Sequence, residues 1–155
     1  MDIHRPKAWH GGRELLKEIA IIVLGVLIAL GAEQAVQAFD WANKAGLAVA
    51  GFAKIEALLA SERALVLIHA TDAAADGVAK LNRRFNALAK LGGDPVAAIR
   101  ELTGAEMSLA MGRPNVIHAA ATEGGATRRL IEEARRLQRY RLGQEASGRV
   151  PPPVN

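Results

Sequence analysis

The stretch Glu18-Ile-Ala-Ile-Ile-Val-Leu-Gly-Val-Leu-Ile-Ala-Leu30 decides where this chain resides. From Ile19 to Ala32 there are fourteen residues without a charge, and nine of them are Ile, Leu or Val. At about −0.3 to −0.6 kcal/mol each, nine such residues favour insertion into a bilayer by about 3 to 5 kcal/mol. We therefore predict a transmembrane helix over residues 13–40, of which residues 15–38 are long enough to span the hydrocarbon core.

Polar and aromatic residues flank this run on both sides. We expect Lys17 and Glu18 at one membrane interface, and Glu33 and Trp41 at the other. Four basic residues precede the run and one follows shortly after it, namely Arg5, Lys7, Arg13 and Lys17 against Lys44. Because cytoplasmic flanks carry the excess of Lys and Arg, we predict a single-pass protein of a bacterial inner membrane. Its N-terminus would be cytoplasmic and its C-terminal part periplasmic.

Two other interpretations of the run stay open. A cleaved signal peptide has the same basic start and short apolar core, and Val36-Gln-Ala38 is an acceptable cleavage site. The mature product would then be a periplasmic helical binding module. The run could also be a buried helix of a soluble protein, since apolar runs of 10–14 residues are often that. The helical pattern continues through Ala38 without a break, which favours the membrane anchor.

The anchor resembles that of a group of uncharacterised bacterial single-pass membrane proteins. The resemblance rests on Glu18-Ile19, on Val23-Leu-Gly-Val-Leu-Ile-Ala-Leu30, and on Gln34 and Trp41. Proteins of that group have a short basic tail, a Glu-Ile-x-x-x-Val-x-Gly-x-Leu-Ile-Ala-Leu helix and a Trp beyond it. The resemblance implies an anchored helical protein, and it implies no activity, ligand or catalytic residue.

Composition limits what the rest of the chain can do. Of the 155 residues, 4% are aromatic and none is cysteine, which excludes disulfides and thiolate chemistry. The net charge of +4 would permit contact with anionic lipid or nucleic acid. This excess is small and spread along the chain, so it favours neither partner.

The whole chain is predicted to be all-α. The transmembrane helix continues into a long amphipathic helix, and a small helical extracytoplasmic domain covers residues 41–143. Apolar positions keep a 3.6-residue period with a bend or break within residues 70–77. Gly92-Gly93-Asp94-Pro95 marks a turn, and we expect helices over residues 95–102, 105–111, 116–123 and 127–142, with Gly112 and Gly143 as stops. Residues 1–12 form a basic cytoplasmic tail and residues 144–155 a disordered one.

Small residues form two stripes along the anchor helix. Gly25 and Ala29, followed by Ala32, form one stripe, and Gly31 and Ala35 belong to the other. Small residues at this spacing let membrane helices approach closely. We therefore predict that these five residues pack against another helix. Besides the lipid bilayer, a second copy of the chain is the partner that this pattern suggests.

Residues with catalytic or metal-binding chemistry are few. His69 and Asp72 are spaced to share one helix face, and Glu62 is the only acid placed to be a third partner. His118 and Glu123 are spaced i,i+5, so they do not share a face. No nucleophile elbow or phosphate-binding glycine loop is present in the sequence. We predict no catalytic, cofactor-binding or metal-binding residue, and hence no enzyme.

The last predicted helix is rich in arginine and could bind anionic headgroups or nucleic acid. Its charges, however, form the i,i+4 pairs Arg128–Glu132, Arg129–Glu133 and Glu132–Arg136, which are typical of a solvated, self-neutralised face. A single aromatic residue gives no stacking platform for single strands. We expect no nucleic-acid partner. The sequence thus predicts a non-catalytic, membrane-anchored helical protein that makes protein contacts outside the membrane.

Overall fold

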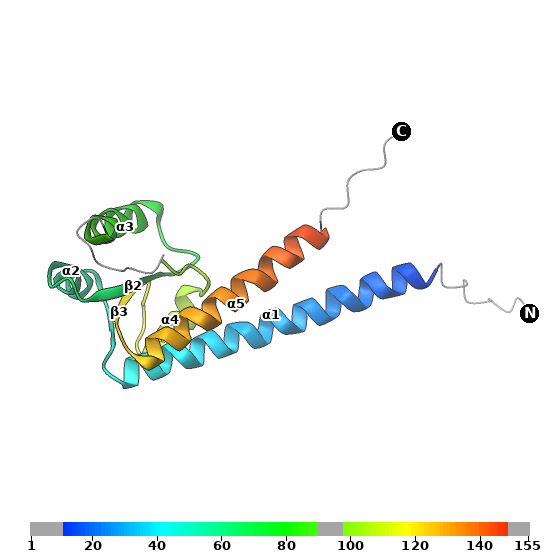
Figure 1. The fold of residues 1–155 in the computed structure, drawn as a ribbon, viewed down its shortest axis with the longest axis horizontal. Coiled ribbons are helices and arrows are strands. Elements are labelled where there is room, and N and C mark those ends of the chain that lie inside the picture. The colour runs from blue at the N-terminus through cyan, green and yellow to red at the C-terminus, as the bar shows by residue number, and fades with distance from the viewer. Residues whose placement is uncertain (1–10, 90–97, 149–155) are drawn as a thin grey trace, which may run out of the picture.

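The computed structural model describes residues 11–89 and 98–148 (Figure 1). The elements follow the order α1 (Gly12–Lys44), β1 (Ala48–Ala50), α2 (Phe52–Ala60), β2 (Ala64–His69), α3 (Ala75–Ala89), α4 (Gly104–Met111), β3 (His118–Thr122) and α5 (Gly125–Gly148). The three strands form one antiparallel sheet in the order β1-β3-β2. The fold is therefore mostly helical, with one long N-terminal helix and a small central sheet.

The sheet divides the core into two layers. On one face, Val66, Ile68 and the two outer alanines of β3, Ala119 and Ala121, pack with residues of α1, α4 and α5. On the other face, Leu67 and Ala120 pack with residues of α2 and α3. Because the alanine side chains of β3 are small, the helices on both faces can pack close to the sheet. The described part is thus a sandwich of helices around a three-stranded sheet.

The prediction of an all-α chain is wrong because the strands do not alternate between apolar and polar residues. Residues Ala64–His69 form a nearly continuous apolar run, and Ala119, Ala120 and Ala121 are all buried. A strand that is covered on both faces has no polar side, so it lacks the period of two that betrays a half-exposed strand. Such short apolar runs also fit a helical pattern.

Two of the expected helices are extended segments. Residues 116–123 contain β3 in place of a helix, and Asn115, the expected cap, has a positive φ of 56°. Residues 98–102 are not helical either, since Ile99 bridges Ile68 in parallel beside β2. The expected helix over residues 95–102 is therefore wrong for these five residues, and residues 95–97 lie outside the described ones.

The expected continuation of the transmembrane helix into one long amphipathic helix is wrong, because α1 ends at Lys44 and is followed by β1, α2 and β2. The remaining helical predictions are confirmed in their main parts. The apolar face of α3 is buried through Val78, Leu81 and Phe85. Helix α4 ends at Gly112, whose φ of 62° is in the left-handed region that favours glycine. Helix α5 passes through Gly143 to Gly148, so the stop expected at Gly143 is wrong and residues 144–148 are helical. The terminal tails over residues 1–10 and 149–155 lie outside the described residues.

Candidate functional site

The N-terminal part of α1 carries an exposed apolar surface, and we call residues 15–30 the apolar arm. Seven large apolar side chains on it are between 47% and 66% exposed: Leu16, Ile19, Ile21, Ile22, Val23, Val26 and Leu30. Soluble proteins rarely expose a contiguous apolar surface of this kind without a partner to cover it. Among the described residues, α1 is the one helix that is long and apolar enough to cross a membrane.

The C-terminal part of α1 belongs to the folded domain. Ala35, Ala38, Phe39 and Ala42 are all fully buried in the core beneath the sheet. The exposed apolar surface therefore ends near Leu30, earlier than the span over residues 15–38 that the sequence suggests. At 1.5 Å per residue the arm is about 24 Å long, which is somewhat less than a hydrocarbon core of about 30 Å.

Helix α5 lies along α1 in the opposite direction (Figure 1). The guanidinium of Arg129 is 4.9 Å from the ring centroid of Trp41 at one end of this seam. At the other end, a side chain built on Gly31 would lie 3.4 Å from atoms of Leu137 and Tyr140. The two contacts are ten residues apart on α1 and about ten residues apart on α5, so they define the register of the two antiparallel helices.

The structure separates the five predicted helix-packing residues. Gly31 and Ala35 are buried within the chain, Gly31 directly against α5. Gly25 and Ala29 are exposed on the apolar arm, nothing lies within 4 Å of a side chain built on Gly25, and Ala32 is half-buried. The stripe of Gly31 and Ala35 is therefore packed inside the domain, whereas Gly25 and Ala29 of the other stripe are exposed on the surface of the arm. The four predicted interface residues Lys17, Glu18, Glu33 and Trp41 are all exposed on α1.

A histidine pair, in which His69 is buried and His118 half-buried, joins β2 to β3. His69 and His118 are partners in the strand register, and their Nδ1 atoms are 2.9 Å apart. The rings meet edge to face at 81°. His69 is almost completely buried, and its Nε2 is 2.9 Å from Oδ1 of Asn82 on α3. The pair thus ties the two strands to the helix that covers them.

The hydrogen-bond partners assign the tautomers of this pair. Because Oδ1 of Asn82 only accepts, His69 Nε2–H donates to it, and His69 Nδ1 then accepts from His118 Nδ1–H. This arrangement leaves Nε2 of His118 unprotonated and directed towards Gly77. A side chain built on Gly77 would lie 2.9 Å from that nitrogen, so only glycine fits the position without a shift of the ring.

The surroundings lower the pKa of both imidazoles and so favour their neutral forms. Burial lowers the pKa of His69; the hydrogen bond that its Nε2–H donates to Asn82 opposes this shift, and the positive charge of Arg100 adds to it. Burial, and then the charge of His69, lowers the pKa of His118. Two neutral, hydrogen-bonded histidines are what a packed strand pair requires, because an unpaired buried charge is costly.

The residues that the sequence grouped with these histidines lie elsewhere. Asp72 accepts a hydrogen bond of 2.8 Å from the main-chain N–H of Gly104 at the start of α4, and makes none with His69. Glu123 pairs with Arg128. Among the described residues, no group of three or more His, Asp or Glu side chains could hold a metal ion. The pair lacks an acidic third member, so its arrangement supports a structural role.

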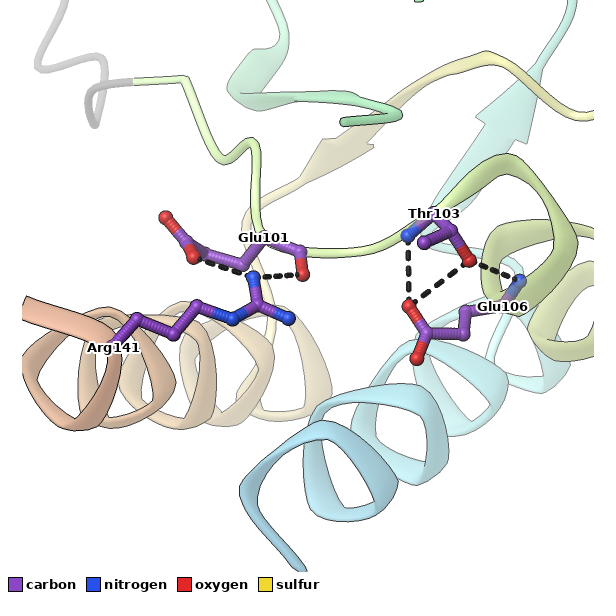
Figure 2. Close-up of polar contacts among 4 residues, drawn as sticks. All are labelled: Glu101, Thr103, Glu106 and Arg141. Atoms are coloured by element: carbon purple, nitrogen blue, oxygen red, sulfur yellow. Dashed lines mark hydrogen bonds and ion pairs between the residues drawn. The ribbon is translucent and has the colours of Figure 1, made fainter. Parts of the chain in front are cut away.

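Two polar contacts hold the connection between the sheet and α4 (Figure 2). Nη1 of Arg141 on α5 donates to both the main-chain carbonyl and a carboxylate oxygen of Glu101, at 2.6 and 2.9 Å. The side chain of Thr103 accepts from the N–H of Glu106, whose carboxylate accepts from the N–H of Thr103 at 2.7 Å. This reciprocal capping box begins α4. The first contact binds the C-terminal part of α5 to the domain.

Comparisons with known proteins find a similar fold but no similar sequence. No protein-family model matches the sequence, and no curated protein is significantly similar to it. A Bacillus halodurans protein of unknown function has a similar structure, with a TM-score of 0.56 and 15% identity over 66% of this chain and 97% of its own. A Giardia lamblia 15.5kD RNA binding protein reaches a TM-score of 0.49 and 14% identity, over 73% of this chain and 89% of its own. At this identity, the likeness to the Bacillus protein shows the fold alone.

Proposed function

We propose that this chain is a single-pass membrane protein of a bacterial inner membrane. Its apolar arm would span the bilayer, and its α/β domain would sit on the periplasmic side and make protein contacts there. The observation that carries the proposal is the row of seven large apolar side chains left exposed on the arm. A domain of this size gains nothing from exposing them to water, whereas lipid covers them at a gain of about 0.3 to 0.6 kcal/mol each.

The packing of α1 supports an uncleaved anchor over a released periplasmic module. Cleavage after Ala38 would remove Ala35 and Ala38, both fully buried, from the core. It would also remove Gly31 from its contact with Leu137 and Tyr140. A signal peptide is discarded after export, so it does not normally supply core residues of the mature domain. We therefore favour a protein that keeps the whole of α1.

A non-catalytic role is part of the proposal. The histidine pair uses three of its four ring nitrogens in hydrogen bonds, one to Asn82 and one between the two rings. The fourth, Nε2 of His118, is directed at the backbone of Gly77. A general base needs a reacting group within hydrogen-bond reach, and the close approach of Gly77 narrows the space beside this nitrogen. The pair is better suited to holding β2, β3 and α3 together.

Self-association through the arm follows from its open stripe. Gly25 and Ala29 are exposed and spaced four residues apart, as in membrane helices that pack closely. Substituting leucine at either position should weaken association in a membrane two-hybrid assay. The substitution Leu27→Ala lies on the opposite side of the helix and serves as the matched control. Equal association of all three variants and the parent would show that the arm is only an anchor.

The proposal is tested by extracting the full-length protein from bacterial membranes. Because its anchorage is apolar, neither high salt nor alkaline carbonate should release it. A periplasmic reporter fused after residue 148 should be active, and a reporter that works only in the cytoplasm should be silent there. Release of the intact chain by either wash would overturn the membrane anchor, and the reverse reporter pattern would overturn the topology.

A further inference from the structure

Three arginines of α5 have no place in the ion pairs of the described residues: Arg129, which lies against the ring of Trp41, and Arg135 and Arg139. The ion pairs that involve α5 join Arg128 to Glu123, Arg136 to Glu133 and Arg141 to Glu101. Among the described residues, Arg135 and Arg139 make no ion pair. Both are exposed, and at a spacing of four residues they share one face of the helix. The ion pairs of the described residues include neither Arg129–Glu133 nor Glu132–Arg136.

The register of α5 against α1 fixes the height of these two arginines. Tyr140 contacts the position of Gly31, and the exposed surface of the apolar arm ends one residue earlier, at Leu30. Arg139, the neighbour of Tyr140, therefore lies level with the end of the arm. Arg135 lies about one helical turn closer to the sheet. Both side chains are exposed while Leu137, between them in the sequence, is buried in the seam.

We propose that Arg135 and Arg139 bind the phosphates of anionic phospholipids in the leaflet next to the domain. The inference rests on the proposed function, since it needs the arm to be in the bilayer. The planar guanidinium group forms paired hydrogen bonds to phosphate oxygens. Tyr140, half-buried at the same level, is a residue type that favours the interface between membrane and water.

Three acidic side chains lie near this face: Glu132, Glu33 and Glu145, of which Glu145 is exposed beyond Arg139 towards the C-terminal end of α5. Glu132 is exposed on the same side of α5, but it lies one turn further from the arm than Arg135. Glu33 of α1 is exposed near the level of Leu137. Arg136 is committed to Glu133 and Arg141 to Glu101. Arg135 and Arg139 thus place two guanidinium groups without an ion pair among the described residues near the end of the arm, where an anionic surface strengthens contact about five-fold per basic residue.

A single labelled cysteine tests this proposal, because the chain has none of its own. Leu142 is 57% exposed on α5, three residues beyond Arg139. The Leu142→Cys variant of the full chain, labelled with a polarity-sensitive fluorophore, is reconstituted in vesicles of phosphatidylcholine alone or with phosphatidylglycerol. We expect stronger, blue-shifted emission in the anionic vesicles, and loss of this increase in 0.5 M salt. Adding Arg135→Gln/Arg139→Gln should abolish the increase.

The control removes two charges elsewhere: Lys54→Gln/Arg63→Gln, exposed residues near the two ends of α2, should keep the full increase. Carbonate extraction of the same vesicles reports insertion of the arm independently. Release by carbonate would refute the proposed anchor. Retention with identical emission in both lipids would refute the lipid contact alone. Capture of a labelled nucleic acid, lost in the arginine double variant and without any lipid dependence, would assign this face to nucleic acid and overturn the proposal.

Discussion

Replacing Val23 with arginine should release the protein from membranes and leave its domain folded. Val23 lies near the middle of the apolar arm and is 51% exposed. The substitution loses about 0.3 to 0.6 kcal/mol of apolar transfer and adds about 2.5 to 3.5 kcal/mol for a charge at the centre of the span. The total of about 3 to 4 kcal/mol is comparable to the whole gain expected from the nine residues of the apolar run. Partition into the membrane should therefore fall by about a hundred-fold or more.

The assay is carbonate extraction of the full-length chain, with thermal unfolding in detergent followed by circular dichroism. Val23→Ala keeps the arm apolar and should stay with the membrane. Phe39→Ala is the reciprocal control, since Phe39 is fully buried in the domain; it should cost about 3 to 5 kcal/mol of stability and leave partition unchanged. Membrane retention of Val23→Arg at the parental level, or a large loss of thermal stability in that variant, would refute the reasoning.

Three further outcomes concern the folded domain. Leu137→Ala removes a fully buried side chain from the contact with Gly31 and should lower the unfolding free energy, measured by urea titration, by about 2 to 5 kcal/mol. The control Leu109→Ala, at an exposed position, should change it by less than about 0.5 kcal/mol. Gly77→Ala should lower the melting temperature, and no change would show that the ring of His118 moves aside freely. The unfolding free energy should be constant above about pH 6.5 and fall below it, because the unfolded chain then takes up protons that the histidine pair, with its lowered pKa values, does not. His69→Gln/His118→Gln should lose much of this dependence, and an unchanged profile would contradict the assigned cause.

Elements with a polar side could be predicted from the sequence. The amphipathic faces of α3 and α5 stand out because each has one apolar side, and Leu130, Ile131, Ala134 and Leu137 are buried as expected. The apolar arm is evident from its lack of charge. Glycine at a helix end also predicted the stop at Gly112. Gly143 stops nothing because glycine costs only about 1 kcal/mol inside a helix, a cost that the packing of α5 on α1 can offset.

Elements buried on every side could not be predicted in this way. The strand β2 consists of Ala, Leu, Val and Ile and ends in a histidine, and β3 is three alanines between His118 and Thr122. Such runs fit either a helix or a strand. The contact between His69 and His118 joins residues 49 positions apart and exists only because the strands pair in one register. A helix over this segment would place His69 beside Asp72. Nothing in the sequence around His69 indicates that its partner is His118 on β3. The burial of Gly31 in α1 likewise depends on its contact with Leu137 and Tyr140 of α5.

Cysteine protection along α1 tests the central claim most directly. Single cysteines at Ile22 and Val26 of the arm, and at Leu109 of the domain as an accessible control, are exposed in vesicles to a charged, membrane-impermeant maleimide. Leu109 is 74% exposed on α4, and both arm positions are more than half exposed in the folded chain. If lipid covers the arm, the maleimide should label position 109 rapidly and positions 22 and 26 only after detergent is added. Rapid labelling at all three positions in intact vesicles would contradict the account.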